Sequence, residues 1–505
     1  MPFAHVHSIT LTGVQGHLVE VEADITNGPP GLLLVGLPDA VVRETTDRVR
    51  AAILNSGETW PQRKITVTLS PVSLPKRGTG SDLAIAAAIL AASGAVPPDA
   101  LAGLVLLGEL GLDGQVRPVT GILPAVTAAA ACGFTAVAVP QAGAAEAALV
   151  PGMRVLPVPG LAGLLAHLRG RNGSDLPVAV PGQDRPGPAT GAAGVAGQPD
   201  LCDVRGRPGA RRAAEVCAAG GHHLAMTGPP GAGAAMLAER LPGLLPPLGH
   251  AAMEVTAVHS LAGRLPPGQP LITSPPLSAP HHTATKAAIF GGGSGTIRPG
   301  AVSLAHRGVL FLQDAPEFSR DVLDALRQPL ETGEVAVARS GLRARFPARF
   351  LLVVAARPCP CAQPAGCTCT LFAKRCYQSR LSGLLNHVEV KAELRPAAVA
   401  GPPGETSAAV AARVALARER AAARLAGTPW RLNSEIPGSE LRRRFPPGRD
   451  ALARVERALQ LGQISAATAG RVLRVAWTLA DLAAKPRPGP GETGEALSLW
   501  LGVTP

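Results

Sequence analysis

Aromatic residues are scarce in this sequence. Phe, Trp and Tyr make up 3% of the 505 residues, and only one of them is a tyrosine. Hydrophobic residues nevertheless account for 46% of the chain, so its cores must be built from Ala, Val and Leu. A chain of this length and composition is expected to form about three globular domains, each with its own core.

Lysine is also rare, with six residues among the 48 basic ones. Arginine supplies the remainder, and the formal net charge is +12. Because Ala, Gly and Pro are abundant throughout, this bias fits a GC-rich genome as well as it fits selection for binding a polyanion. The charge permits nucleic acid as a partner but does not by itself indicate one.

Long apolar segments are missing as well. The most hydrophobic run, Leu83–Val96, is about 14 residues long, whereas a membrane-spanning helix needs about 20. The N-terminus lacks the basic segment and following apolar stretch of a secretory signal. We therefore predict a cytoplasmic protein without a membrane partner.

The cysteines are concentrated in one place. Four of the eight fall within eleven residues, a spacing that indicates a local cluster in a reducing compartment and not a disulfide framework. Four thiolates are the number that a tetrahedral zinc ion requires. The segment predicts either a zinc site or a reduced loop kept for packing. The zinc ligands would be Cys359, Cys361, Cys367 and Cys369, and Cys376 is a spare candidate ligand. The other three lie in apolar runs and are predicted to be buried thiols: Cys132, Cys202 and Cys217.

The first third of the chain alternates strand-like and helix-like segments. His7–Ala23 and Ile65–Leu69 show the alternation of β-branched residues that is typical of strands. Asp39–Leu54 and Asp82–Ala92 show the apolar spacing of helices. The pattern predicts a mixed α/β domain.

A second α/β pattern follows and gives way to helices. Arg211–Ala219 is predicted to be a helix and His222–Met226 a strand, which a Gly/Pro loop joins to a further helix at Ala234–Leu245. Two more buried strands are predicted at Gly308–Leu312 and Arg349–Ala355. The C-terminal part is predicted to be helical, including Thr406–Leu425 and Arg449–Leu461.

The Gly/Pro loop has the layout of a phosphate-binding P-loop. In the pattern G-x-x-x-x-G-K-[ST], backbone N–H groups and a helix N-terminus face the anion. Here Ala occupies the last two positions, so the ammonium and the hydroxyl are missing. The candidate nucleotide-binding residues are Gly228, Pro229, Pro230, Gly231, Ala232, Gly233, Ala234 and Ala235.

Several motifs resemble the YifB/ComM group of magnesium-chelatase-like AAA+ proteins. They stand in the order and spacing of that family and include SLPKRGTGSDLAIAAAILAA, GELGLDGQVRPVTGILP, GPPGAGAAMLAERLPGLLPPL, APHHT, SLAHRGVLFL, LRQPLETGEVAVAR and PCPC followed by CTC. The resemblance implies a homo- or hetero-oligomeric ring whose family uses ATP with Mg²⁺. The best-studied branch of the family moves along branched DNA, and magnesium chelatase subunits are more distant relatives.

The resemblance also implies an α/β fold with a definite domain order. It assigns residues 1–170 to an α+β domain like the Lon protease proteolytic domain, and 171–199 to a Pro- and Gly-rich linker. Residues 200–395 would form a P-loop AAA+ α/β core related to magnesium chelatase. Residues 396–505 would form a C-terminal helical lid.

Lon-type peptide cleavage requires a Ser nucleophile and a Lys that activates it. The resemblance places these two roles at Gly80 and Leu123, and neither residue can perform them. Ser81 and Lys76 are nearby but stand in the wrong register. A structural or substrate-docking role is therefore predicted for the N-terminal domain.

Further positions of the family's nucleotide site differ from its pattern. The second catalytic strand should lead into Asp-Glu, and here it leads into Gln313 and Asp314; Asp314 is a vestigial acid at the catalytic Glu position. The polar sensor matches Arg357, an Arg of the C-terminal helix matches Trp477, and a Pro-Leu-Leu-Asp-Arg segment is replaced at Leu384–His387. These changes predict a pseudo-ATPase that still holds a phosphate weakly through its backbone.

Two other features have more than one interpretation. Arg442–Arg444, with Arg449, either contacts a phosphate backbone or forms a solvated helix end. His281 and His282 match a family motif and are predicted to lie in a structural loop, because adjacent His residues in a helix or strand do not share a face.

Three functions therefore remain open. The chain is a catalytically impaired ring subunit or regulator near DNA, a slow ATP-dependent DNA motor, or a chelatase-like partner that inserts Mg²⁺ into a porphyrin. We favour the first, because the substitutions in the nucleotide site are concerted. Nothing supports the third beyond kinship of fold, which does not determine function.

Overall fold

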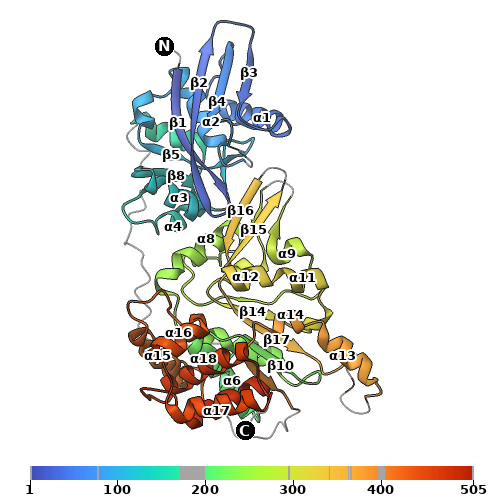
Figure 1. The fold of residues 1–505 in the computed structure, drawn as a ribbon. Coiled ribbons are helices and arrows are strands. Elements are labelled where there is room, and N and C mark those ends of the chain that lie inside the picture. Colours follow the sequence, from blue (N-terminus) through green and yellow to red (C-terminus); the bar gives the residue numbers. More distant parts are fainter. Residues whose placement is uncertain are drawn as a thin grey trace.

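The computed structural model describes residues 3–502 except 75, 77–78, 171–198, 294–295, 340–341, 362, 364–366 and 396–403. Figure 1 shows an N-terminal domain (residues 3–170) stacked on a core domain (199–395), with a helical domain (404–502) beside the core. The predicted linker lies outside the described residues, except for its last position. Within the described ranges, no helix combines the length and the apolar character needed to cross a bilayer.

A seven-stranded mixed sheet forms the N-terminal domain, in the order β3-β4-β2-β1-β5-β8-β9. The predicted strand segment His7–Ala23 is in fact an antiparallel hairpin of two long strands. The strands are β1 (Phe3–Thr12), β2 (Gln15–Thr26), β3 (Gly31–Val35), β4 (Lys64–Ser70), β5 (Leu104–Leu106), β8 (Ala136–Pro140) and β9 (Arg154–Val158), and β6 (Glu109–Leu110) and β7 (Val116–Arg117) form a separate small hairpin.

Helices cover both faces of this sheet, and each face has its own core. The predicted helices at Asp39–Leu54 and Asp82–Ala92 are confirmed to within one residue. Every residue of the second is buried, so the most apolar run of the chain lies in the core of the N-terminal domain. The helices are α1 (Asp39–Asn55), α2 (Asp82–Ala92), α3 (Ile122–Ala131), α4 (Ala144–Ala147) and α5 (Leu161–Leu168).

A five-stranded parallel sheet forms the centre of the core domain, in the order β11-β14-β17-β10-β18. The three strands predicted in this region are present, with bounds shifted by one or two residues. In a parallel sheet, the loops that follow the strands meet at one edge. The strands are β10 (Leu224–Thr227), β11 (Leu277–Ser278), β14 (Val309–Leu312), β17 (Leu351–Ala356) and β18 (Val390–Glu393).

Short helices and two hairpins surround the core sheet. The predicted helix at Ala234–Leu245 ends at Arg240 and continues as a 3₁₀ turn, because Pro242 has no N–H to extend the α-helical ladder. The helices are α6 (Pro208–Gly220), α7 (Ala234–Arg240), α8 (Ala252–Ala262), α9 (Lys286–Phe290), α10 (Ala301–Leu304), α11 (Arg320–Ala325), α12 (Arg327–Thr332), α13 (Leu371–Ser379) and α14 (Ser382–Leu385). The hairpins are β12–β13 (Gly291–Gly292, Arg298–Pro299) and β15–β16 (Glu334–Arg339, Leu342–Pro347).

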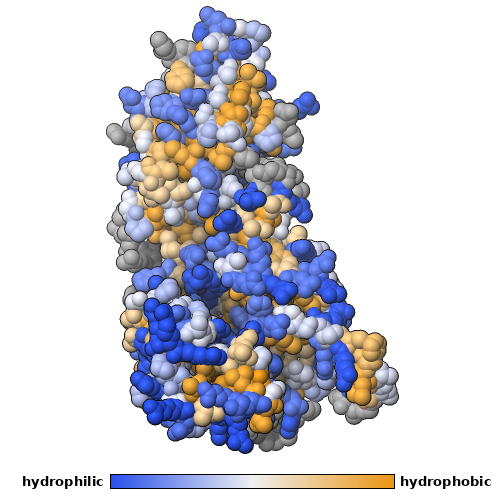
Figure 2. Space-filling view, viewed as in Figure 1, coloured by the Kyte–Doolittle hydropathy of each residue, from blue (hydrophilic) through white to orange (hydrophobic). Residues whose placement is uncertain are grey.

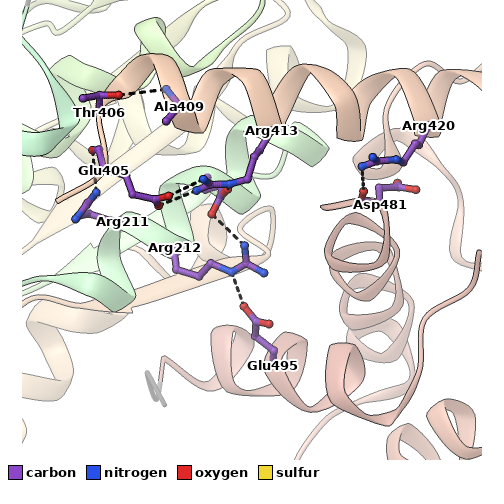
Figure 3. Close-up of polar contacts among 10 residues, drawn as sticks. Arg211, Arg212, Glu405, Thr406, Ala409, Arg413, Arg420, Asp481 and Glu495 are labelled. Atoms are coloured by element: carbon purple, nitrogen blue, oxygen red, sulfur yellow. Dashed lines mark hydrogen bonds and ion pairs between the residues drawn. The ribbon is translucent and has the colours of Figure 1, made fainter. Parts of the chain in front are cut away.

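The helical domain packs on α6 and β18 and shares one hydrophobic core with them. Arg413 of the first helix binds Glu215 of α6 and Glu405, and Arg212 of α6 binds Glu495 of the last helix (Figure 3). The two long helices that the sequence predicts here are confirmed. The helices are α15 (Ser407–Arg424), α16 (Gly438–Arg444), α17 (Arg449–Gln460), α18 (Ala466–Leu482) and α19 (Pro490–Leu501).

The N-terminal domain contacts the core domain directly. Met253 and Ala257 of α8 pack against the core around α3. The Gly121 N–H donates to the Ser260 carbonyl at 3.2 Å, and the Ser260 hydroxyl donates to Glu146. Figure 1 shows β1 next to the β15–β16 hairpin at the same junction. The N-terminal domain is therefore docked onto the core by packing and hydrogen bonds.

The cysteine burial predictions are only partly correct. Cys217 is buried in α6, as expected. The prediction is wrong for Cys132, which is exposed because it caps the surface end of α3. Cys202 is half-buried in a 3₁₀ turn. Apolar neighbours in the sequence therefore do not reveal whether a cysteine lies at the end of a helix or in a turn, where it is less buried.

A buried charge cluster joins the core and helical domains. The Glu389 carboxylate lies 2.8 Å from His222 Nδ1 and accepts from Arg474 Nη1 at 2.9 Å. The hydroxyl of Thr478 lies 2.7 Å from His222 Nε2. Burial raises the pKa of Glu389, but His222 and Arg474 outweigh it and hold this pKa at about 2.

We predict that Glu389→Gln lowers the free energy of unfolding by about 3 kcal/mol at neutral pH, because it leaves the half-buried Arg474 without its buried counter-charge. The folded-state pKa lies below the ordinary value of 4.5, so this stabilisation is complete above pH 4.5 and disappears as the pH falls towards 2. Urea unfolding of both proteins at several pH values measures it. Glu393→Gln, which changes an exposed residue on the same strand, is the control. A difference between wild type and Glu389→Gln that does not shrink in acid would contradict the assignment.

Candidate nucleotide and metal sites

The P-loop follows β10 at the carboxyl edge of the core sheet. The Gly228 N–H donates to the Ala356 carbonyl at 3.1 Å, and a Cβ at Gly228 would lie 2.6 Å from the Leu394 carbonyl oxygen. Gly233 has a φ of +92°, in the left-handed region that favours glycine. The loop therefore keeps a backbone course that only glycine permits at these positions.

The two alanines after this loop form the first turn of α7. Ala234 and Ala235 are half-buried, and their methyl groups pack against the core. Their N–H groups have no acceptor within the helix, because the first turn of a helix never does. Ala232 is different, since its N–H donates to the Pro229 carbonyl at 3.1 Å. The loop thus offers backbone donors to an anion but neither an ammonium nor a hydroxyl.

A guanidinium lies beside the loop, which the sequence did not reveal. Arg207, immediately before α6, has its Cζ 3.2 Å from the position of a Cβ on Gly233. Its Nη1 donates to the Arg205 carbonyl at 3.2 Å, whereas its buried Nε has no partner among the described residues. The only signal in the sequence for a role of Arg207 at the P-loop is its position just before α6, the helix that precedes β10.

A second guanidinium lies between the loop and the acid at the end of β14. Arg357 follows β17, the strand between β10 and β14. Its Nε lies 3.1 Å from Asp314 Oδ1, and its Nη2 lies 2.5 Å from Glu317 Oε1. Gln313 is exposed, and Asp314 has a left-handed φ of +49°. Both acids that follow β14 therefore have Arg357 as their counter-ion.

The structure does not gather all of the substituted positions at this edge. Trp477 is 3% exposed, its indole N–H donates to the Phe445 carbonyl at 3.2 Å, and Arg424 lies 4.2 Å from its ring centroid. It belongs to the packing of the helical domain. Leu384–His387 precedes β18 and so lies at the amino edge of the sheet. The P-loop, Asp314 and Arg357 are the predicted positions that meet.

The cysteine loop, between β17 and α13, brings its thiols together. The Sγ atoms of Cys359, Cys361 and Cys367 are 3.3, 3.4 and 3.5 Å apart in pairs, and those of all four cysteines lie within 4.8 Å of one another. A tetrahedral zinc with bonds of about 2.3 Å separates its sulfur ligands by about 3.8 Å. The Cys369 N–H and the neighbouring thiols lower the pKa of Cys367 to about 6, which favours a thiolate. Cys376 is exposed on α13 and is not part of the group.

The segment after the cysteine loop carries exposed apolar side chains. Leu371 is 75% exposed and Phe372 is 76% exposed at the start of α13. Figure 2 shows an apolar patch at the projecting tip on the lower right, where Figure 1 places α13. Other described residues therefore leave most of the surface of these two side chains uncovered.

The remaining candidates do not form sites in the described chain. The Lys76 ammonium donates to the carbonyls of Pro71 and Leu74 at 2.5 and 3.3 Å, whereas the Ser81 hydroxyl lies 3.4 Å from that of Ser8. The nearby Ser and Lys are therefore engaged separately. His281 and His282 lie in a loop with ring centroids 4.1 Å apart, as expected for a structural turn.

Comparisons with known proteins place the chain in a family. It is 49% identical over 505 residues to an uncharacterized protein of Mycobacterium tuberculosis, covering 99% of this chain and 98% of that one. It is 39% identical to the uncharacterized protein YifB of Escherichia coli (95% of this chain, 94% of that one) and 37% identical to the competence protein ComM of Haemophilus influenzae (98% and 97%). The chain belongs to the YifB/ComM family of magnesium-chelatase-like proteins.

Family profiles support the predicted fold of this YifB/ComM family member. The profile for magnesium chelatase subunit ChlI matches residues 200–401, and its C-terminal profile matches 404–499. A further ChlI profile matches residues 21–143. The N-terminal region is also similar to the Lon protease of Mycolicibacterium smegmatis, with 27% identity over 139 residues (26% of this chain, 18% of that one). A Lon-like N-terminal domain, an AAA+ core and C-terminal helices are confirmed as the fold class.

The sole tyrosine of the chain reports on the acidic cluster at the carboxyl edge. The Tyr377 hydroxyl donates to Glu317 Oε1 at 3.0 Å. Burial and this hydrogen bond raise the pKa of Tyr377 to about 12, and Arg357 acts in the opposite direction. The near-ultraviolet absorbance of tyrosinate therefore measures the cluster directly.

We predict that native protein shows less tyrosinate than unfolded protein at every pH between 10 and 12, values that bracket the ordinary and the raised pKa. Glu317→Gln should lower the pKa of Tyr377, because it removes the charge that favours the neutral phenol. Arg357→Met should raise it further. Identical titration curves for native and unfolded protein would show that the cluster does not form.

Proposed function

We propose that this YifB/ComM family member is a catalytically impaired ring subunit or regulator associated with DNA processing. One observation carries the proposal: Arg357 is paired with Asp314 directly beside a P-loop that ends in Ala234 and Ala235. The boundaries that go with it are a Lon-like domain at 1–170, a linker at 171–199, a core at 200–395 and a helical lid at 396–505. We place this assembly in the cytoplasm.

Magnesium has few ligands at this edge. A hydroxyl from the P-loop and a carboxylate from the end of the strand normally hold it, and here these positions are Ala235 and Gln313. A hard cation prefers carboxylate oxygen to a neutral amide. The remaining acid, Asp314, is neutralised by Arg357 at 3.1 Å. A Mg²⁺ ion that approached would have to displace a guanidinium held by two carboxylates.

Phosphate binding without hydrolysis remains feasible. The N–H groups at the start of α7 and the guanidinium of Arg207 provide donors for an anion. Replacing the P-loop Lys by Ala234 removes charge-assisted hydrogen bonds worth about 1.5–3 kcal/mol each. We therefore propose weak binding of ATP or its phosphates, with a loss of affinity of at least about tenfold for each such bond.

The link to DNA rests on the family and on charge. A relative at 37% identity is named for competence, and the chain has a formal net charge of +12. The basic run of α16 adds little. Arg443 and Arg444 both pair with Glu440, which leaves Arg442 as the uncommitted member of the run in the described residues. We propose that DNA association depends on ring assembly and not on this run alone.

The alternative is a slow ATP-dependent DNA motor. Asp314 stands where the family has its catalytic Glu, and 36% of its side chain is exposed. If Arg357 swung away, Asp314 could orient a water molecule. This alternative requires turnover that depends on Asp314.

We predict that purified protein hydrolyses ATP at the background rate and that Asp314→Asn does not change this rate. The combined variant Ala234→Lys, Ala235→Thr, Gln313→Asp and Arg357→Asn restores the groups missing at the carboxyl edge and should raise turnover at least about tenfold. Arg442→Ala, which changes an exposed arginine elsewhere, is the control. Wild-type turnover above background that Asp314→Asn abolishes would establish the slow motor instead.

We further propose that the cysteine loop holds a structural zinc ion. Four thiols converge within 4.8 Å on a short segment, and Cys367 favours the thiolate form. Such a site closes a loop that has no core of its own, and metal binding then contributes to its folding. A reduced loop kept for packing is the alternative.

We predict about one zinc ion per chain by metal analysis, the stoichiometry of a four-thiolate site. Cys359→Ser should lower the zinc content and the melting temperature, since it removes one ligand. Cys376→Ser, a matched change outside the cluster, should retain both. If the protein contained no zinc and a chelator left its melting temperature unchanged, the packing alternative would be favoured.

A further inference from the structure

A cavity of about 540 Å³ lies at the opposite edge of the core sheet from the P-loop. Its floor is formed by the amino ends of β10, β14 and β17, and its walls by the end of α12 and by helices α15 and α18. No residue of the P-loop lines it. The cavity therefore sits between the core and the helical domain and is separate from the nucleotide site.

The lining of this cavity is rich in arginine. Five guanidinium groups and three carboxylates line it, and Glu254, outside the lining, lies 3.8 Å from Arg307, which leaves a local excess of one positive charge when the histidines are neutral. The arginines are Arg307, Arg349, Arg418, Arg471 and Arg474, and the acids are Glu331, Glu389 and Glu435. In a partly enclosed space, this excess favours an anion more strongly than an equal excess would in water.

Three of the arginines, Arg349, Arg418 and Arg471, have no carboxylate within ion-pair distance among the described residues, and the last two belong to the helical domain. Arg418 donates to the Ala218 carbonyl at 2.9 and 2.6 Å, and burial lowers its pKa to about 10. Arg471 has no carboxylate within ion-pair distance in the described chain, and its Cζ lies 5.7 Å from the centroid of the Trp500 ring. Burial lowers the pKa of Arg471, Glu389 acts in the opposite direction, and the neighbouring Arg474 lowers it further. An anion between these guanidinium groups would supply the missing counter-charge.

A neutral hydrogen-bond donor completes the lining. His223 Nδ1 accepts the Leu352 N–H at 3.0 Å, so the proton of its neutral ring must be on Nε2. Burial lowers the pKa of His223 to about 4, and the ring is therefore neutral at pH 7. No described residue accepts from Nε2, although the ring lines the cavity. An N–H donor beside guanidinium groups without a carboxylate partner suits a ligand with several acceptor oxygens and a negative charge.

We propose that this cavity binds a small phosphate-bearing anion that joins the core to the helical domain. Guanidinium groups bind phosphate oxygens through paired N–H donors, which is the chemistry that Arg418 and Arg471 present. A volume of about 540 Å³ accommodates pyrophosphate or the phosphates of a nucleotide. Because the ligand would touch β10 on one side and α18 on the other, its binding stabilises the contact between the two domains. The proposal does not depend on whether the P-loop binds ATP.

Calorimetric titration of the full-length protein tests the proposal, with pyrophosphate and ATP as separate probes. Pyrophosphate should bind and should raise the melting temperature. Arg471→Ala should weaken this binding at least about tenfold, the equivalent of one charge-assisted bond. Arg442→Ala should change it less than about twofold, because this residue does not line the cavity. Binding of ATP that is equally sensitive to Arg471→Ala would identify nucleotide phosphates as a source of the ligand.

The outcomes that overturn the proposal are specific. Failure of wild-type protein to bind either probe at millimolar concentration rejects the site. Loss of pyrophosphate binding in Arg207→Ala but not in Arg471→Ala assigns the anion to the P-loop. Binding of DNA alone, and of neither small anion, replaces the small ligand by a nucleic acid. If Arg471→Ala fails to fold, Arg471→Gln replaces it, because glutamine keeps a hydrogen-bonding side chain without the charge. Arg471→Gln should also weaken pyrophosphate binding at least about tenfold.

Discussion

The ion pair between Arg357 and Asp314 governs what the carboxyl edge of the core sheet can do. The strand order places β17 between β10 and β14, so a residue after β17 must lie between the P-loop and the acid after β14. An arginine there can reach both Asp314 and Glu317. It supplies a fixed positive charge beside carboxylates that would otherwise attract a divalent cation. The two alanines of the loop are consistent with that arrangement, because they remove the remaining contacts to a metal and to the terminal phosphate.

The same sheet separates two environments. At the carboxyl edge, the P-loop and the Arg357 cluster lie in the segments that follow the strands. At the amino edge, the residues that precede the strands line an arginine-rich cavity against the helical domain. Glu389 and His222 link the two domains beside that cavity through a buried charge cluster. The helical domain is thus held to the core by polar contacts at the amino edge as well as by the shared hydrophobic core around α6. A phosphate-bearing ligand in the cavity would add to an existing junction.

Local patterns in the sequence were sufficient for much of the fold. The long run of helix-forming apolar residues after Asp82 and the alternation at Ile65–Leu69 were clear signals, and both elements are where they were predicted. The turn at Gly13 was missed, because the β-branched alternation continues on both sides of it. The proximity of the four thiols followed from their spacing alone.

Arg357 and Asp314 are 43 positions apart, and the sequence carries no signal that they pair; strand order decides it. The cavity arginines come from the segments before β14 and β17 and from α15 and α18, and only the packing of domains brings them together. Cys132 shows the reverse error, since its apolar neighbours concealed its place at a helix end.

The proposed loss of ATP hydrolysis requires the claim that this candidate nucleotide site does not use magnesium. Equilibrium titration of ATP into the full-length protein, with and without Mg²⁺, tests that claim most directly. We expect weak affinities that are equal within about twofold, because the ion has no carboxylate free to hold it. A gain in affinity of about tenfold or more with Mg²⁺, lost in Asp314→Asn, would show that Asp314 leaves Arg357 for the metal and would contradict the account.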